Sequence, residues 1–253
     1  MHNPTNRVLQ ILNLFINNKK LNFSQISTLT DIPKGTLSPI LNELIEKSYL
    51  NRSKTMGFYT LGLQTFRLGV EFLNQNNLLE FIKVHMQEIV RQCDETCQFG
   101  ILEAGNVLYL QKVESQNSIR LFSFVGKQLP AYATAIGKAL LSDKDEKELQ
   151  NLYPKNLETF TKNTIKTRDI LLKELQEIAK SGIATENGGY TEDIRCVAVP
   201  IKNYENKVIA AISVSFPAFR IDDKKYDFII EVLKKELLKI QNEIKFLNHD
   251  FRF

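Results

Sequence analysis

Residues 21–61 read LNFSQISTLTDIPKGTLSPILNELIEKSYLNRSKTMGFYTL and contain two short helical patterns separated by a tight break. In the first pattern Phe23, Ile26 and Leu29 recur at steps of three, so they share one face of a helix. The second pattern spaces its apolar residues at steps of four, three and one: Leu37, Leu41, Leu44 and Ile45. Because the break at residues 30–33 is so short, the two helices have the layout of a helix-turn-helix.

A basic hairpin is expected to follow the two helices. Tyr49–Leu50 begins one strand, Phe58–Leu61 returns as the second, and residues 52–57 form a basic loop between them. Gly57 in that loop is free to adopt the positive φ that a tight turn often needs. A helix-turn-helix followed by such a hairpin is a winged helix.

The net positive charge of the chain is concentrated in this segment. Residues 1–60 hold seven Lys and Arg against three Asp and Glu, and the remainder holds 26 of each sign, so the whole net charge of +4 lies in the first 60 residues. Attraction to phosphates favours such a distribution in a DNA-binding module. A lysine-rich solvated face would explain the charge by itself equally well.

Polar and basic side chains of this module are the candidates for contacts with double-stranded DNA. They are Thr5, Arg7, Lys34, Thr36, Ser38, Arg52 and Lys54. We expect the helix over residues 33–48 to lie in the major groove, near bases or phosphates. The two wing residues would contact phosphates, and the two residues at the start of the first helix would add further phosphate contacts.

Gly35 and Pro39 stand in the helix that should read DNA. Proline lacks an N–H and crowds the carbonyl four residues back, which costs about 3 kcal/mol inside a helix, and glycine costs roughly 1 kcal/mol relative to alanine. We therefore expect this helix to start late or to kink near residues 35–39. The helix would then make few contacts to base edges, and DNA binding would depend steeply on the salt concentration.

The 253 residues have room for one large domain or two modest ones. A polar interruption at residues 74–77 divides a long helical pattern, which places the boundary in a solvated stretch. We assign the winged helix-turn-helix to residues 1–65, a linker helix to 66–79 and a second domain to 80–253. In the second domain strands and helices follow one another without strict βαβ alternation, which predicts a two-domain α+β protein.

Several function classes find no support in the sequence. No apolar run approaches the ~18–20 residues of a membrane span, and the N-terminus lacks a signal-peptide pattern, so we expect no membrane partner. Three scattered cysteines are too few for a disulfide framework and indicate a reduced, cytoplasmic setting. Cys196 has no histidine nearby in the sequence, so we expect no catalytic residue and no cofactor. Cys93 and Cys97 lack a second close pair, which favours buried thiols over metal ligands.

Eight short segments occur together in a recognisable order and spacing. They are Arg7–Leu12, Ile32–Leu37, Leu44–Leu50, Tyr59–Gly62, Leu108–Ser115, Ala133–Leu141, Arg195–Pro200 and Ala210–Ser215. Together they resemble the IclR family of bacterial transcription regulators over nearly the whole chain. The resemblance implies an N-terminal winged helix for DNA and a C-terminal GAF-like domain that binds a small effector, often an organic acid. It also implies a homodimer or homotetramer on pseudo-palindromic sites.

The resemblance also implies an effector site. The effector's carboxylate would meet backbone amides at the start of a small helix, where free N–H groups suit an anion. The positions concerned are Ala135 and Ile136 for the amides, and Glu186, Ile194, Cys196, Ser213 and Ser215 for the pocket side chains. Ser213 and Ser215 alternate along one strand, so their hydroxyls face the same side. With Cys196 they would form one polar patch in an apolar cavity.

The chain departs from the family pattern in two places. Glu186 stands where a shorter Asp is common, followed by Asn187-Gly188-Gly189 where many relatives are acidic, and Ser38-Pro39 replaces a longer polar or basic pair. The effector therefore need not be one of the family's best-known acids. Two alternatives stay open: an enzyme acting on a small acid in its C-terminal domain, and a DNA-binding protein without an effector.

Overall fold

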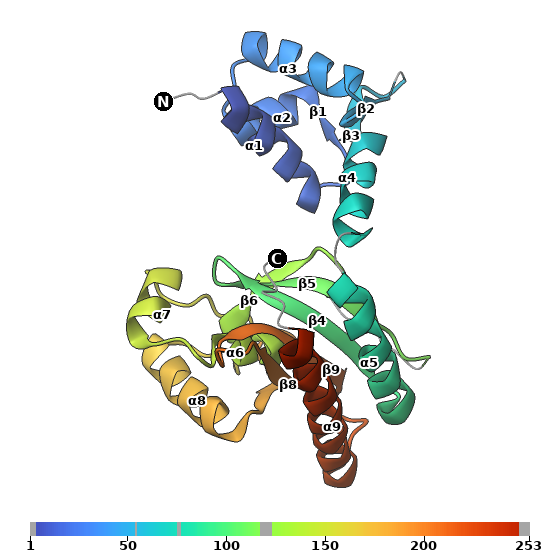
Figure 1. Cartoon of the computed structure of the whole chain (residues 1–253). Helices are drawn as coiled ribbons and strands as arrows, with labels where there is room; N and C mark the ends of the chain where they lie inside the picture. Colours follow the sequence, from blue (N-terminus) through green and yellow to red (C-terminus); the bar gives the residue numbers. More distant parts are fainter. Residues whose placement is uncertain (1–3, 54, 75–76, 117–122, 248–253) are drawn as a thin grey trace. The chain divides into compact units, whose positions relative to one another are not determined.

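The computed structural model describes residues 4–53, 55–74, 77–116 and 123–247, and it divides into two compact units, Met1–Asn77 and Leu78–Phe253 (Figure 1). Within those described ranges, no helix is long and apolar enough to cross a membrane. Each unit has its own hydrophobic core.

The N-terminal unit is a winged helix. Its elements are α1 (Pro4–Asn17), β1 (Leu21–Asn22), α2 (Phe23–Thr30), α3 (Lys34–Glu46), β2 (Leu50–Arg52), β3 (Phe58–Leu61) and α4 (Leu63–Asn74). The three strands form an antiparallel sheet in the order β1-β3-β2. The predicted apolar stripes meet in its core, where Ile26, Leu37, Leu41 and Leu44 are buried. Gly57 takes the predicted positive φ, at 64°.

Local signals in the sequence fix the first helix of the motif, α2. Asn22 caps α2 by accepting a hydrogen bond from the Gln25 N–H at 2.9 Å, and the Gln25 side chain accepts one from the Asn22 N–H at 2.8 Å. This reciprocal capping box satisfies two N–H groups that a helix start leaves unpaired. Asp31 ends α2 in the left-handed conformation, with φ 53°. Helix α2 is therefore defined at both of its ends.

The expected late start of α3 is wrong. The helix begins at Lys34 and continues through Pro39 to Glu46. The carbonyl of Pro33 accepts hydrogen bonds from the N–H groups of Thr36 and Leu37, both at 2.9 Å. Gly35 and Pro39 are exposed, so water can solvate the Gly35 carbonyl that Pro39 cannot reach. A bend near Pro39 stays a prediction.

The C-terminal unit is built on one six-stranded antiparallel sheet in the order β6-β5-β4-β9-β8-β7. Its strands are β4 (Thr96–Glu103), β5 (Asn106–Val113), β6 (Gln128–Pro130), β7 (Ala184–Asn187), β8 (Ile194–Lys202) and β9 (Val208–Pro217). Its helices are α5 (Asn77–Cys93), η1 (Ala131–Ala133), α6 (Ala135–Leu141), α7 (Glu146–Leu152), α8 (Arg168–Ser181) and α9 (Asp223–Leu247). Together with the winged helix, this gives the predicted α+β architecture.

The two faces of this sheet carry different side chains. Cys97 and Phe99 of β4 point to the face covered by α5 and α9, because side chains alternate along a strand. His85 of α5 and Glu236 of α9 join these helices through a 2.7 Å contact between Nδ1 and Oε2. The opposite face, which packs against α6, is lined by small residues of β8 and β9 such as Ala198 and Ala211. That face also carries the polar side chains described next.

Candidate functional site

The start of α6 opens onto a cavity of about 240 Å³ in the C-terminal unit. Thr134 caps the helix, and its Oγ1 accepts a hydrogen bond from the Gly137 N–H at 3.1 Å. The first N–H groups of a helix have no acceptor inside it, so those of Ala135 and Ile136 stay available to a ligand. Both residues line the cavity.

Gly137 fixes the position of α6. A Cβ on this residue would lie 2.1 Å from the Ala131 carbonyl oxygen and 2.3 Å from the Ala131 Cα, both backbone atoms that cannot move aside cheaply. Only a residue without a side chain allows η1 and α6 to pack this closely. The N–H groups at the start of α6 are thereby held by a rigid backbone contact.

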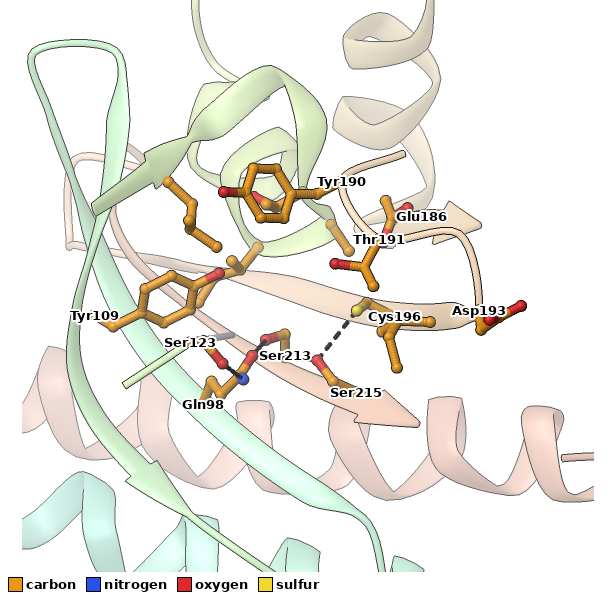
Figure 2. A pocket seen from close by; sticks show the side chains of 15 residues that line it. Gln98, Tyr109, Ser123, Glu186, Tyr190, Thr191, Asp193, Cys196, Ser213 and Ser215 are labelled. Carbon is orange, nitrogen blue, oxygen red and sulfur yellow. Dashed lines mark hydrogen bonds between the residues drawn. The ribbon is translucent and has the colours of Figure 1, made fainter. Parts of the chain in front are cut away.

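A network of buried polar side chains forms the floor of the cavity (Figure 2). Gln98 of β4 is its centre: Oε1 accepts hydrogen bonds from Ser213 Oγ at 3.3 Å and from Ser215 Oγ at 3.1 Å. Gln98 Nε2 donates to Ser123 Oγ. All four residues are at most 6% exposed, so these groups satisfy one another rather than water.

Cys196 of β8 borders this floor. Its Sγ lies 3.1 Å from Ser215 Oγ. Burial raises the pKa of the Cys196 thiol, and the nearby Glu186 carboxylate raises it further. The group is therefore a neutral thiol at physiological pH, which makes it a poor nucleophile.

Glu186 of β7 lines the same cavity and is 9% exposed. Its Oε1 accepts a hydrogen bond from the Gly189 N–H. Burial raises the pKa of Glu186, against the opposing effects of the Gly189 N–H and the positive charge of Lys138. A Cβ on Gly189 would lie 3.1 Å from Glu186 Oε1, so the glycine leaves room for the longer acidic side chain.

Aromatic and polar side chains complete the walls and rim. Tyr109 and Tyr190 line the cavity together with Thr191, and Asp193 lies exposed at its edge (Figure 2). The Tyr190 ring packs against Phe160 with 4.9 Å between the ring centroids. Burial raises the pKa of the Tyr109 hydroxyl, which keeps it neutral. Uncharged polar groups and the Glu186 carboxyl group therefore line the cavity, with Asp193 at its rim.

The structure brings all seven predicted effector-site residues together around this cavity. They are Ala135, Ile136, Glu186, Ile194, Cys196, Ser213 and Ser215. Sequence reasoning missed Gln98, Tyr109, Ser123 and Tyr190. The alternation Thr96, Gln98, Gly100 against Cys97, Phe99, Ile101 was the available signal for Gln98, because it separates polar or small residues from large apolar ones. No comparable pattern marks Tyr190, which stands in a loop.

The predicted DNA-contacting residues lie on the N-terminal unit, mostly at its surface. Lys34 and Ser38 are exposed on α3, Thr36 is partly buried, and Asn42, which was not predicted, is exposed on the same face one turn further along. Arg52 is exposed at the end of β2, with its guanidinium carbon 5.7 Å from the Tyr59 ring centroid. On α1, Thr5 is exposed and Arg7 partly buried. Lys54 lies outside the described residues.

The remaining cysteines are buried free thiols. Burial raises the pKa of Cys93 to about 11, and it also raises the pKa of Cys97. Among the residues that the structure describes, no group of three or more His, Cys, Asp and Glu side chains could hold a metal ion. Cys93 and Cys97 therefore belong to the apolar core between the sheet and α5.

A winged helix-turn-helix combined with an α+β domain that encloses a polar cavity defines a class, the DNA-binding transcription regulators with an effector domain. The family can also be stated. Residues 5–54 match the IclR helix-turn-helix domain, and residues 70–242 match the bacterial transcriptional regulator IclR C-terminal domain. The chain belongs to the IclR family. It is a transcription regulator and not an enzyme.

Similar proteins match nearly the whole length of the chain. The HTH-type transcriptional regulator XynR of Escherichia coli is 32% identical over 94% of this chain and 95% of its own length. KdgR of Escherichia coli is 28% identical over 98% and 94%. An IclR homologue from Microbacterium hydrocarbonoxydans, complexed with 4-hydroxybenzoate, has the same fold, with a TM-score of 0.82, 22% identity and coverage of 96% and 99%.

Proposed function

We propose that the effector of this regulator is a small organic acid that binds in the cavity at the start of α6. The observation that carries the proposal is the position of the Ala135 and Ile136 N–H groups, which open into a cavity whose other walls supply hydroxyl, amide and thiol groups. Backbone N–H groups without an internal acceptor suit a carboxylate.

Size and chemistry support a compact ligand. A cavity of about 240 Å³ lies just below the roughly 300–1,000 Å³ of typical ligand sites. The related structure complexed with 4-hydroxybenzoate supports the view that a domain of this fold can hold a small carboxylate. In this chain the acid's carboxylate would bind to α6, and Glu186, Ile194, Cys196, Ser213 and Ser215 would contact the rest of the molecule.

We propose that the N-terminal unit binds DNA through its exposed basic and polar face. We further propose that the protein acts in the cytoplasm. Helix α3 would enter the major groove of double-stranded DNA, with Lys34, Thr36 and Ser38 near bases or phosphates. Arg52 and Lys54 of the wing would contact phosphates. Thr5 and Arg7 would add phosphate contacts from the start of α1.

We further propose a homodimer or homotetramer in which α4 takes part. None of the residues that the structure describes in helix α4 is buried. Among them, Leu63, Phe66 and Leu73 are apolar and at least 50% exposed. A second copy of the chain would cover these side chains and place two winged helices on a pseudo-palindromic site. Domain limits at 1–65, 66–79 and 80–253 would make α4 the linker that carries the effector's influence. An effector alters DNA binding only if it prefers one arrangement of the two winged helices.

A two-part experiment tests the proposal. First, the thermal unfolding of the full-length protein is followed with a panel of small acids, because a ligand at 100 times its Kd adds ~2.7 kcal/mol to stability. Second, operator binding is measured with every acid that stabilises the protein. We expect Ser213→Ala to weaken ligand binding and Ser53→Ala, an exposed wing residue, to leave it unchanged. An acid that occupies the pocket but never alters DNA binding would support the alternative of a regulator without an effector switch.

A further inference from the structure

Gln98, which was not among the predicted site residues, lies at the centre of the hydrogen-bond network on the cavity floor. It stands on β4 directly opposite Ser213 of β9 in the register of the sheet. Its side chain is 3% exposed, and both of its amide atoms are engaged: Oε1 by two serine hydroxyls and Nε2 by Ser123. The side chain therefore determines how the hydroxyl groups on the cavity floor are oriented (Figure 2).

The orientation of these hydroxyls sets what the floor offers a ligand. A serine hydroxyl has one hydrogen to donate and two lone pairs to accept with. Because Ser213 and Ser215 give their hydrogens to Gln98 Oε1, they present lone pairs to the cavity. With the Ser215 hydrogen directed to Gln98, the thiol is the donor in the 3.1 Å contact between Cys196 Sγ and Ser215 Oγ. The part of the floor formed by Ser213 and Ser215 therefore presents hydrogen-bond acceptors.

The ionisable side chains that line the cavity add further hydrogen-bond acceptors. The buried carboxyl group of Glu186 also lines the cavity, and the exposed Asp193 stands at its rim. No Lys or Arg is among the cavity-lining residues within the described part of the chain. One side of the cavity therefore supplies N–H donors from Ala135 and Ile136, whereas Ser213, Ser215 and Glu186 supply acceptors.

We propose that Gln98 is a specificity-determining residue that makes this pocket select hydroxylated acids. The acid's carboxylate accepts from the start of α6, and its hydroxyl group donates to Ser213 or Ser215. A keto acid or an unsubstituted acid offers no donor to the floor and leaves buried acceptors unpaired, which is the arrangement that discriminates most strongly between close analogues. The inference rests on the proposed function, because it presupposes an acid in this cavity.

Matched acids test the inference on the full-length protein by isothermal titration calorimetry. The pairs are lactate against propionate, lactate against pyruvate, and 4-hydroxybenzoate against benzoate, which differ only at the group facing the floor. We expect the hydroxylated member of the best-fitting pair to bind at least about tenfold more tightly than its partner. Tighter binding of pyruvate than of lactate would show that the amide is turned the other way and would overturn the inference.

A variant of the residue itself separates its role from mere pocket shape. Gln98→Met keeps the length of the side chain and removes both polar atoms of the amide, so the two serines regain free hydrogens. We expect the preference for the hydroxylated acid to fall to about one, while the shared affinity for carboxylates persists. Gln176→Met, on the exposed face of α8, is the matched control and should leave both quantities unchanged.

The outcomes distinguish this inference from the proposed function. Acids that bind without preference for the hydroxyl group overturn the role of Gln98 and leave the acid site standing. Failure of every acid to bind overturns both. If Gln98→Met does not fold, the double variant Ser213→Ala/Ser215→Ala removes the same acceptors. It must abolish the preference, and a preference that survives it would contradict the inference.

Discussion

The two units of the molecule place their functional polar groups in opposite environments. Lys34, Ser38 and Arg52 of the N-terminal unit stand in water, whereas Gln98 and Ser213 of the C-terminal unit are at most 3% exposed. A surface charge acts on its partner through a screened field and is nearly independent of its neighbours. A buried polar group depends on every partner that satisfies it.

This difference indicates how each unit responds to amino-acid substitutions. On the exposed face, single substitutions should weaken binding in small steps that add. Around the cavity, one substitution should disturb hydrogen bonds across β4, β8 and β9 together. The same chemical change made in both units is therefore the sharpest comparison, and α3 and α6 each contain a glycine that permits it.

The largest expected effect is that of Gly137→Ala. Its Cβ would meet the Ala131 backbone at 2.1 Å, so α6 has to move away from η1. We expect the C-terminal unit to lose at least about 3 kcal/mol of unfolding free energy, as overpacking against backbone does at its upper end. Calorimetry of the full-length protein would show its transition at a lower temperature and without stabilisation by acids.

Gly35→Ala is the counterpart in the N-terminal unit. A Cβ there would have nothing within 4 Å. Alanine is the better helix former by up to ~1 kcal/mol, so this variant should stabilise its unit slightly. Equal losses for the two substitutions would contradict the contrast between an open helix surface and a closely packed one.

Local patterns were enough to predict the N-terminal unit. The helix-turn-helix rests on apolar steps and a short break within residues 21–46, so its contacts lie close along the chain. The late start expected for α3 is wrong because it rested on helix propensity alone, whereas the burial of Leu37, Leu41 and Leu44 in the core outweighs the cost of Gly35 and Pro39.

The cavity was only partly predictable, because its floor depends on distant pairings. Ser213 and Ser215 could be grouped by alternation on one strand. Their shared partner Gln98 lies more than 100 residues away, and only the pairing of β4 with β9 brings it opposite Ser213. A resemblance indicates positions of this kind, but the sequence does not state which amide satisfies which hydroxyl.

Pro39→Ala is the next prediction in size and examines the open surface of α3. Restoring the N–H allows a bond to the Gly35 carbonyl, and alanine relieves the ring's contact with that carbonyl. Proline also restricts the unfolded chain, and replacing it by alanine raises the conformational entropy of the unfolded state, which offsets part of the gain in stability. We expect about 2 kcal/mol of added stability in the N-terminal unit, measured by urea unfolding. No gain would mean that a bend at Pro39 already removes the cost.

Substitutions of single basic residues test whether the surface charges of the N-terminal unit contribute to DNA binding independently of one another. Arg52→Ala and Lys34→Ala each remove one proposed phosphate contact. Each should reduce the slope of log Kd against log salt by about 0.9, and the double variant by about twice that. Fluorescence anisotropy with operator DNA at several salt concentrations measures both. Lys173→Ala, exposed on α8, is the control that keeps the full slope.

The smallest predicted effect concerns pH and the buried carboxyl group. Burial raises the pKa of Glu186 in the folded protein above its ordinary value in the unfolded chain. The folded state then binds the proton more tightly, so the C-terminal unit loses stability as pH rises from the ordinary carboxyl pKa through the raised one. Glu186→Gln lacks this titration, and its unfolding free energy should stay flatter over that range than that of Glu231→Gln, an exposed control on α9.

Binding of an acid in the same cavity extends this argument. A bound carboxylate disfavours the charged form of Glu186 further, so binding takes up a proton and should tighten as pH falls through that range. In Glu186→Gln the affinity should no longer follow pH there, which calorimetric titrations at three pH values would detect. An unchanged pH dependence in the variant would place the bound acid too far from Glu186 for their charges to interact.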